Sequence, residues 1–306
     1  MKTLTFTVSA SEAGQRIDKL VVARTDLGRR RVAELFSTGN VVVSGRRVPK
    51  GEPAREGDEI VVSIEGDDRA SPEPEARLAV RLETPHCVIV AKPAGQPSAP
   101  LRGESGTLAG ALLGHYPEMA DVGHSPREPG LLHRLDTQTS GLIVAARSVD
   151  AFNRLHLALR EGAMTKRYLA IVDAEGLGEA GVIDAPIAPD RKNPKRVLVD
   201  EGLTPRTGKN RARPAATNYR VVRRQGALAL IELTVSRALR HQIRAHLASI
   251  GHPLIGDATY GGRQAPELGE RHALHASYIA WAGDDTIAGF ALDEALPADM
   301  ESLIAG

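Results

Sequence analysis

A carboxylate at position 136 stands where a polar turn runs into an apolar stretch, and its surroundings could support chemistry. The stretch 132–145 reads Leu-His-Arg-Leu-Asp-Thr-Gln-Thr-Ser-Gly-Leu-Ile-Val-Ala, and its small and β-branched end is typical of a buried strand. Arg134 precedes Asp136 by two residues, and hydroxyl side chains follow it at Thr137, Thr139 and Ser140. A nearby cation and hydrogen-bond donors offset the cost of desolvating a charge, so we expect Asp136 to stay ionised and oriented. Taken alone, such an aspartate could simply cap a turn.

Two further segments bring charged or aromatic side chains into regular patterns. Residues 240–250 have a helical pattern in which Ile243, Leu247 and Ile250 form the buried stripe, and Gly251 and Pro253 follow as the end. Arg240 and Arg244 lie four residues apart and are expected on one face of this helix. Residues 165–172 alternate like a strand and carry Tyr168, a residue type that in such a strand more often belongs to a core.

Metal and redox chemistry find little support in the sequence. His133, His241 and His246 lack a spacing that would place them on one helical face with a carboxylate, so we expect no metal site. The single cysteine, Cys87, excludes an intramolecular disulfide and a multi-cysteine metal site. It lies in the apolar run 87–90 and is expected to be a buried small hydrophobe.

Composition places the chain among ordinary globular proteins, with a local excess of positive charge. The 306 residues are 25% charged and 42% hydrophobic, with a net charge of +1, which permits about two domains. Residues 186–224 hold eleven Lys and Arg against three acids, so a basic face for phosphates is possible although the whole is near neutral. No apolar run reaches membrane-spanning length and no secretory signal precedes the first unit, so we expect a cytoplasmic protein.

The first 64 residues form one unit of helices and small strands. A short helical pattern opens at Arg16, a second helix starts with Arg29-Arg30-Arg31, and Gly39-Asn40 turns into the strand 41–43. A tight turn at Ser44-Gly45 leads into Arg46 and Arg47, and a last strand covers 59–64. This order resembles the S4 RNA-binding domain, although Ser44 stands where that pattern usually has Asn. The resemblance implies that Arg30, Arg31, Arg46 and Arg47 contact RNA phosphates rather than select a sequence; otherwise these arginines form a solvated face.

The rest of the chain divides into a linker and a larger unit. Residues 65–77 combine prolines and acids without apolar periodicity, which predicts a flexible linker. The larger unit, 78–306, mixes strands at 87–91, 165–172 and 228–235 with helices at 108–113 and 150–161. The patterns support an α+β class, with loops and hairpins expected at 186–224, a surface loop at 256–271 and a closing strand from Leu274.

Three separated motifs together resemble the RluA-type RNA pseudouridine synthases. The first is His-Arg-Leu-Asp-x-x-Thr-Ser-Gly-Leu at 133–142, the second is Lys-x-Tyr at 166–168, and the third is His-Gln-Ile-Arg-x-His-Leu at 241–247 with Gly-His-Pro at 251–253. Their order matches the family, and the resemblance extends from about residue 14 to 282. One departure is Ala238-Leu239-Arg240, where the family usually has Gly-Arg-Thr or Gly-Arg-Lys.

The resemblance implies isomerisation of uridine to pseudouridine in RNA, with no metal and no other cofactor. The target base would be flipped out of its stack, and Asp136 would be the nucleophile on either the base or the sugar. Tyr168 would stack on the uracil and help remove its carbon-bound proton, Arg244 would pair with Asp136, and Arg134 would fill the gap left by the base. It also implies a mixed, mainly antiparallel sheet flanked by helices in the catalytic domain.

Two other functions compete with this interpretation. A catalytically inactive, ribosome-associated RNA-binding or chaperone protein would have no need of Asp136, Tyr168 and Arg244 together. A hydrolase acting on a glycosidic bond would require a second catalytic carboxylate. We expect RNA as the partner, ribosomal RNA ahead of transfer RNA because of the S4-like unit, with no membrane and no obligate protein partner. The particular uridine and the oligomeric state are not encoded in these patterns.

Overall fold

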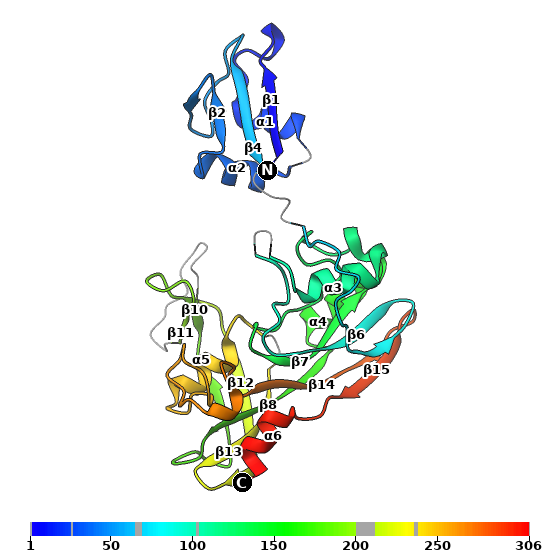
Figure 1. Ribbon diagram of the computed structural model, residues 1–306, viewed down its shortest axis with the longest axis vertical. Helices are drawn as coiled ribbons and strands as arrows, with labels where there is room; N and C mark the ends of the chain where they lie inside the picture. Colours follow the sequence, from blue (N-terminus) through cyan, green and yellow to red (C-terminus); the bar gives the residue numbers. More distant parts are fainter. Residues whose placement is uncertain are drawn as a thin grey trace. The chain divides into compact units, whose positions relative to one another are not determined.

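The computed structural model describes residues 2–25, 27–64, 69–101, 104–199, 212–235 and 238–305. The chain divides into two compact units, unit 1 (Met1–Asp68) and unit 2 (Arg69–Gly306) (Figure 1). Among the described residues, no helix is long and apolar enough to cross a membrane.

Unit 1 is a four-stranded antiparallel sheet covered by two short helices. Its elements are β1 (Lys2–Thr7), η1 (Ala10–Glu12), α1 (Ile17–Arg24), α2 (Arg29–Ser37), β2 (Val41–Val43), β3 (Arg46–Arg47) and β4 (Glu59–Ile64). The strand order is β1-β4-β2-β3. Alternate residues of β2 and β4, such as Val43 and Ile60, are fully buried against Ile17 and Leu35 of the two helices. The first strand was missed in the sequence, where the unit was expected to begin with a helix.

The turn between β2 and β3 contains Ser44, which stands where the S4 pattern usually has Asn. Ser44 has a φ of 45°, in the left-handed region where Asn is better tolerated than most residues. The following Gly45 has a φ of 82°, so the two residues make a tight turn. Arg46 and Arg47 follow it and are exposed, as the hairpin predicted.

Part of the expected linker 65–77 belongs to unit 2. Residues 65–68 lie outside the described part of the chain, but 69–77 pack on unit 2. Ala70 is 3% exposed and its N–H donates to the carbonyl of Pro126. The Glu73 carboxylate accepts from the N–H of Gly106 at 2.9 and 3.0 Å. The absence of apolar periodicity concealed these contacts, because they are made by one small side chain, one carboxylate and the backbone.

Unit 2 is built on a nine-stranded sheet. Its path runs β5-β6-β7-β14-β8-β13-β12-β9, with β15 paired to β14, and every pairing is antiparallel except β7 with β14 (Figure 1). The strands are β5 (Val80–Glu83), β6 (Cys87–Lys92), β7 (Ser140–Ala146), β8 (Thr165–Asp173), β9 (Ala180–Asp184), β12 (Ala216–Gln225), β13 (Leu228–Thr234), β14 (Leu274–Gly283) and β15 (Ala288–Asp293). A separate hairpin joins β10 (Ile187–Pro189) to β11 (Val197–Val199). The expected mixed, mainly antiparallel sheet is confirmed.

Helices cover both faces of this sheet. They are α3 (Leu108–His115), η2 (Pro117–Asp121), α4 (Val149–Glu161), α5 (Gln242–Ser249), η3 (Pro266–Leu268) and α6 (Ala298–Ala305). Residues of α3 and α5 share one core with Tyr168 and Ile143, whereas α4 packs against Leu142 and Val144 on the opposite face. Because neighbouring strand residues point to opposite faces, β7 contributes to both cores, and all seven of its residues are buried.

Several local expectations need correction. Helix α5 begins at Gln242 rather than Arg240, and Ile250, expected in the buried stripe, is 39% exposed beyond its end. The hairpins expected in the basic segment are present, because β10 pairs with β11 and β12 pairs with β13, while 200–211 lie outside the described residues. Strand β14 is central, not closing, because β15 follows and pairs with it. The expected surface loop 256–271 also contains Asp257, which is only 2% exposed.

Gly141 allows the close approach of the two parallel strands. It has a φ of 117°, and a Cβ at this position would lie 2.2 Å from the Ala276 carbonyl oxygen. No larger residue fits such a position without moving the backbone. The glycine therefore sets how closely β7 meets β14, five residues after Asp136.

Candidate active site

Asp136 lies in a loop whose backbone is fixed on both sides. The Ser98 hydroxyl donates to the Leu135 carbonyl at 2.7 Å and accepts from the Leu135 N–H at 3.1 Å. On the other side, the Thr137 carbonyl accepts from the Gly95 N–H at 2.8 Å and from Lys92 Nζ at 3.1 Å. These contacts hold the carboxylate before any substrate is present, as an active site requires.

Lys92 is a buried anchor for this loop. The residue is 1% exposed, and its Nζ also donates to the carbonyls of Pro93 and Gln96 at 2.8 and 2.7 Å. Burial lowers the pKa of Lys92 to about 7, while the charge of Asp136 works in the opposite direction. The three carbonyl acceptors match the three donors of an ammonium group, so the side chain ties β6 to the loop that carries Asp136.

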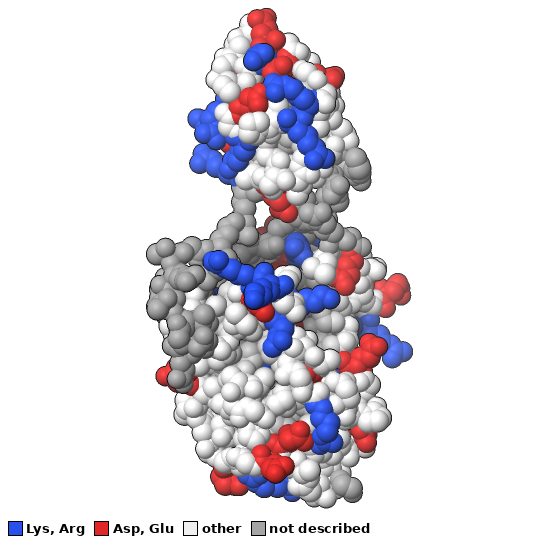
Figure 2. Space-filling model, turned by 90° about the vertical axis from the view of Figure 1, so that its left-hand side faces the viewer, with Lys and Arg blue, Asp and Glu red and all other residues white. Residues whose placement is uncertain are grey.

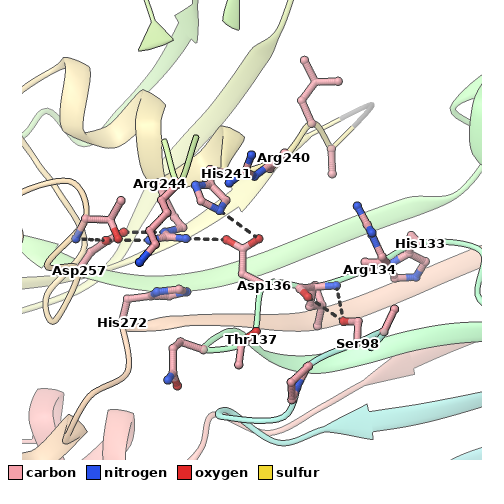
Figure 3. A pocket seen from close by; sticks show the side chains of 18 of the residues that line it. Ser98, His133, Arg134, Asp136, Thr137, Arg240, His241, Arg244, Asp257 and His272 are labelled. Carbon is pink, nitrogen blue, oxygen red and sulfur yellow. Dashed lines mark hydrogen bonds and ion pairs between the residues drawn. The ribbon is translucent and has the colours of Figure 1, made fainter. Parts of the chain in front are cut away.

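Arg244 connects Asp136 to a second, buried carboxylate (Figure 3). Its Nη1 donates to Asp136 Oδ2 at 2.9 Å. Its Nε and Nη2 donate to the two oxygens of Asp257 at 2.7 and 2.9 Å. The side chains of Arg244 and Asp257 are 8% and 1% exposed, whereas that of Asp136 is 26% exposed. The guanidinium is therefore clamped from behind by Asp257 and presents its remaining edge to the one carboxylate that is open to solvent.

The electrostatics of this network keep Arg244 and Asp257 charged. Burial by itself lowers the pKa of Arg244, but the hydrogen bonds that it donates to Asp257 and the charge of Asp136 raise that pKa above its ordinary value. Burial likewise works to raise the pKa of Asp257, and the Arg244 hydrogen bonds outweigh it, so that pKa lies below its usual range. Asp257 is thus held as a buried carboxylate paired with Arg244. With 1% of its side chain exposed, it is not accessible to a substrate as the second carboxylate of a glycosidic hydrolase.

A histidine faces the other oxygen of Asp136. His241 Nε2 lies 3.8 Å from Asp136 Oδ1, and its Nδ1 lies 3.1 Å from the hydroxyl of Tyr260. His241 is the N-cap of α5 and has a φ of 55°. The three histidines considered for a metal have separate partners, because His246 contacts Thr217 and Ala185 while His133 contacts the Val144 N–H.

Tyr168 lies below the site rather than in its wall. It is 5% exposed and packs in the core shared with α3 and α5. Burial, with the charge of Asp136, raises the pKa of Tyr168 to about 12, so the phenol is neutral near pH 7. The described residues that line the cleft include Asp136 and Arg244 but not Tyr168. The structure therefore brings two of the three expected catalytic residues into direct contact and keeps the third within electrostatic reach.

The cleft around Asp136 has a volume of about 1230 Å³ and a cationic lining. Its walls come from the Asp136 loop, β8, the hairpin β10–β11 and the segment leading into α5. Of the described residues that line it, eight are cationic and four are acidic: Arg127, Arg134, Arg160, Lys166, Lys195, Arg213, Arg240 and Arg244 against Glu104, Asp136, Asp257 and Glu270. This excess of four positive charges, in a chain with a net charge of +1, suits a polyanionic ligand.

The immediate partners of Asp136 differ from those expected. Arg134 pairs with Glu128 at 2.6 Å and its side chain is 58% exposed at the cleft. The hydroxyls of Thr139 and Ser140 bond to His272 and His275. Sequence proximity therefore misidentified the groups that hold the carboxylate, because Arg134 points to the exposed rim while Thr139 and Ser140 are buried against the histidines.

The other expected RNA contacts belong to unit 1. Arg46 forms an ion pair with Glu52 at 2.6 Å, and the guanidinium of Arg47 packs over Gly39. Arg30 and Arg31 are in α2, but their side chains are outside the described residues. Figure 2 shows several Lys and Arg side chains on the visible face of this unit.

Three residues of the site were not assigned from the sequence: Lys92, Asp257 and, as a neighbour of Asp136, His241. Each does have a signal in the printed chain. Lys92 precedes a proline that ends a strand, Asp257 follows the Gly-His-Pro block by four residues, and His241 opens the Arg244 helix. These signals mark where a strand ends or a helix begins, but they do not predict which residues the side chain contacts.

The fold defines the class of protein. The solved structure titled "Human RNA Pseudouridylate Synthase Domain Containing 4" superposes with a TM-score of 0.56, at 24% identity, over 72% of this chain and 90% of that one. "Human RNA Pseudouridylate Synthase Domain Containing 1" superposes with a TM-score of 0.55, at 20% identity, over 77% and 96%. Unit 2 therefore has the pseudouridylate synthase fold.

Sequence comparisons establish the family. Residues 86–249 match the RNA pseudouridylate synthase family. The ribosomal large subunit pseudouridine synthase D of Yersinia pestis is 34% identical, over 98% of this chain and 93% of that protein. The uncharacterized RNA pseudouridine synthase YlyB of Bacillus subtilis is 32% identical, over 99% and 98%. The chain belongs to the RNA pseudouridylate synthase family, and it is an enzyme that isomerises uridine in RNA to pseudouridine. The family expected from the motifs is confirmed.

Proposed function

We propose that Asp136 is the nucleophile of this isomerisation, with Arg244 as the residue that holds it. The observation that carries the proposal is the 2.9 Å contact between Arg244 Nη1 and Asp136 Oδ2 at a cationic cleft. Of the two carboxylates on Arg244, Asp136 is the one with an accessible side chain, 26% exposed against 1% for Asp257. An ionised, oriented carboxylate open to a cleft is suited to covalent catalysis.

The reaction moves one glycosidic bond. The bond from the sugar C1′ to N1 of uracil breaks, a bond from C1′ to C5 forms, the C5 hydrogen leaves as a proton, and N1 gains one. A bond from Asp136 to the base or the sugar would hold the nucleotide while the base turns, and its later cleavage returns the carboxylate. The uridine must leave its stack to present these atoms to the cleft.

Tyr168 is proposed to support the uracil from the core side. Its phenol, neutral because its pKa is raised to about 12, would offer a ring face for stacking. It would help to remove the C5 proton by releasing its own hydroxyl proton as it accepts that one. Tyr168 is 5% exposed and does not line the cleft, so this role requires its ring to become accessible when RNA binds. Arg134, 58% exposed at the rim, is proposed to occupy the place that the flipped base leaves.

The proposed substrate is large-subunit ribosomal RNA. The printed name of the Yersinia pestis relative includes the ribosomal large subunit, and the similarity covers 98% of this chain. Such a substrate would place the protein in the cytoplasm with the ribosomes. The helices and hairpin of unit 1 support an S4-like role for it, with Arg30, Arg31, Arg46 and Arg47 on RNA phosphates, which would add affinity rather than sequence choice.

A single substitution tests the nucleophile. Asp136→Asn should abolish pseudouridine formation on extracted ribosomal RNA while RNA affinity stays within about threefold. Asp150→Asn, on the surface of α4 with 71% of the side chain exposed, is the matched control and should retain full activity. Substantial activity in Asp136→Asn would remove Asp136 as the nucleophile.

Mapping of pseudouridines tests the substrate. Cells with and without this protein should differ at uridines of the large-subunit RNA. A difference confined to transfer RNA would replace the proposed substrate, and no difference in any RNA would favour an inactive RNA-binding protein. RNA affinity should also fall with ionic strength through counterion release; a flat salt response would exclude the basic surfaces as the RNA face.

A further inference from the structure

The two oxygens of Asp136 have different surroundings. Oδ2 accepts a hydrogen bond from Arg244 at 2.9 Å, whereas Oδ1 faces Nε2 of His241 at 3.8 Å (Figure 3). A separation of 3.8 Å is too long for a hydrogen bond. Among the described residues no donor lies within hydrogen-bond distance of Oδ1. Oδ1 is therefore the oxygen available to bond with a nucleotide, while the imidazole stands beside it.

The hydrogen bonds of Tyr260 favour one tautomer of the His241 imidazole. The Tyr260 oxygen accepts from the backbone N–H of Val197 at 2.9 Å. Its own proton is then free to be donated to His241 Nδ1 at 3.1 Å. An imidazole that accepts at Nδ1 carries its proton on Nε2 when neutral. In this tautomer the N–H of His241 is on Nε2, the nitrogen that lies 3.8 Å from Asp136 Oδ1.

The backbone holds this histidine in an unusual conformation. A φ of 55° and a ψ of 15° place His241 in the left-handed region, which residues other than glycine and Asn rarely occupy. The Gln242 side chain fixes the turn, because its Oε1 accepts from the Leu239 N–H at 3.0 Å and its amide donates to the Ala216 carbonyl at 2.9 Å. Such backbone strain commonly occurs at functional sites.

We propose that His241 is a positioning residue for the nucleophile: its Nε2–H, set by Tyr260, closes onto Oδ1 of Asp136 when a nucleotide enters the cleft. The donor orients the reactive oxygen and stabilises the carboxylate as its bond to the nucleotide breaks. No proton is transferred by the histidine. The proposal rests on the proposed function, because it assigns the reactive atom to Asp136.

Charged groups on several elements face the imidazole and favour its neutral form. Burial lowers the pKa of His241, Arg244 and Arg240 act in the same direction, and Asp136 and Asp257 oppose them. The remaining neighbour is the phenol of Tyr260, whose pKa is raised by burial. His241 is thus neutral near pH 7, the state in which a single N–H faces Oδ1.

Two amide substitutions at His241 distinguish a role as hydrogen-bond donor to Asp136 from a purely structural role. In His241→Gln the amide nitrogen takes the place of Nε2, whereas in His241→Asn it reaches only as far as Nδ1. Single-turnover pseudouridine formation should fall about 10- to 100-fold in His241→Asn, the effect of losing one hydrogen bond to a charged group, and by less than about threefold in His241→Gln. Asn tolerates the left-handed backbone, so the melting temperature of that variant should not fall.

The tautomer is tested by Tyr260→Phe, which should slow the wild-type enzyme several-fold and have a smaller effect in the His241→Gln background. His115→Gln, on the exposed end of α3, is the control and should leave the rate unchanged. Equal rates in wild type, His241→Asn and His241→Gln would overturn the proposal, and so would equal losses in both variants. Those results require an active wild type with an essential Asp136; activity in Asp136→Asn would instead refute the proposed function.

Discussion

Removing the charge of Asp257 is the most direct test of how the site is held together. Asp257→Asn keeps the size of the side chain and an oxygen that can still accept from the N–H groups of Thr259 and Tyr260, at 3.1 and 3.3 Å. It replaces one of the two carboxylate oxygens that clamp Arg244 with a nitrogen that cannot accept. The substitution therefore changes charge and the Arg244 contacts while leaving the loop turn intact.

The burial of the ion pair sets the size of the effect expected for Asp257→Asn. Removing one partner of a buried ion pair costs about 3–5 kcal/mol, and Arg244 and Asp257 have 8% and 1% of their side chains exposed. Arg244 retains Asp136 as a partner, which favours the lower end, about 3 kcal/mol of unfolding free energy. An arginine no longer clamped from behind would also hold Asp136 less well, and we expect the single-turnover rate to fall about 100-fold, as for a small displacement of a reacting group.

Denaturant unfolding and single-turnover pseudouridine formation measure the two effects. Asp299→Asn is the matched control, since Asp299 pairs with the buried Arg271 at 3.2 Å but is itself 32% exposed. It should cost no more than about 1 kcal/mol and leave the rate unchanged. An Asp257→Asn variant as stable and as active as wild type would show that the clamp does not hold Arg244.

The pH dependence of stability gives the same test a second readout. The pKa of Asp257 lies below its ordinary value of 3.8 because the Arg244 hydrogen bonds outweigh the effect of burial. A lowered carboxyl pKa contributes stability that is complete above pH 3.8 and is lost as the pH falls through the folded-state pKa. Asn does not titrate, so the difference in stability between wild type and Asp257→Asn should narrow in acid; a constant difference would contradict the ion pair.

Three other substitutions test separate parts of unit 2. Lys166 lines the cleft and is 6% exposed, and burial lowers its pKa to about 8. RNA affinity measured by filter binding should therefore weaken as the pH rises through this value, and Lys166→Met should lose that pH dependence. Lys92→Met removes the side-chain tie to the Thr137 carbonyl and should slow single-turnover catalysis about tenfold with unchanged RNA affinity. Gly141→Ala would place a Cβ 2.2 Å from the Ala276 carbonyl oxygen and should cost about 3 kcal/mol in denaturant unfolding. The expectations would be refuted by a retained pH dependence in Lys166→Met, by an unchanged rate in Lys92→Met and by wild-type stability in Gly141→Ala.

Local patterns in the sequence were sufficient for most of the secondary structure. The run after Ser140 was expected as a buried strand and is β7, and the Phe152 and Leu155 stripe ended by Gly162 is α4, with that glycine in the left-handed conformation. These elements are specified by side-chain periodicity and by the chemistry of their ends, which are properties of neighbouring residues. The first strand, Lys2–Thr7, was missed because it is defined by its pairing with β4 rather than by a strong apolar pattern.

The sequence by itself determined that Asp136 is the reactive carboxylate candidate and that Arg244, 108 residues away, accompanies it. Only the tertiary structure decided what holds them: Asp257 behind the arginine, Lys92 beneath the loop and His241 beside the free oxygen. It also directed Arg134 to Glu128 and placed Tyr168 in the core. The reason is physical, because the burial and charge around a side chain are set by strands and loops that meet only when the sheet is assembled, and no spacing along the chain records those distances.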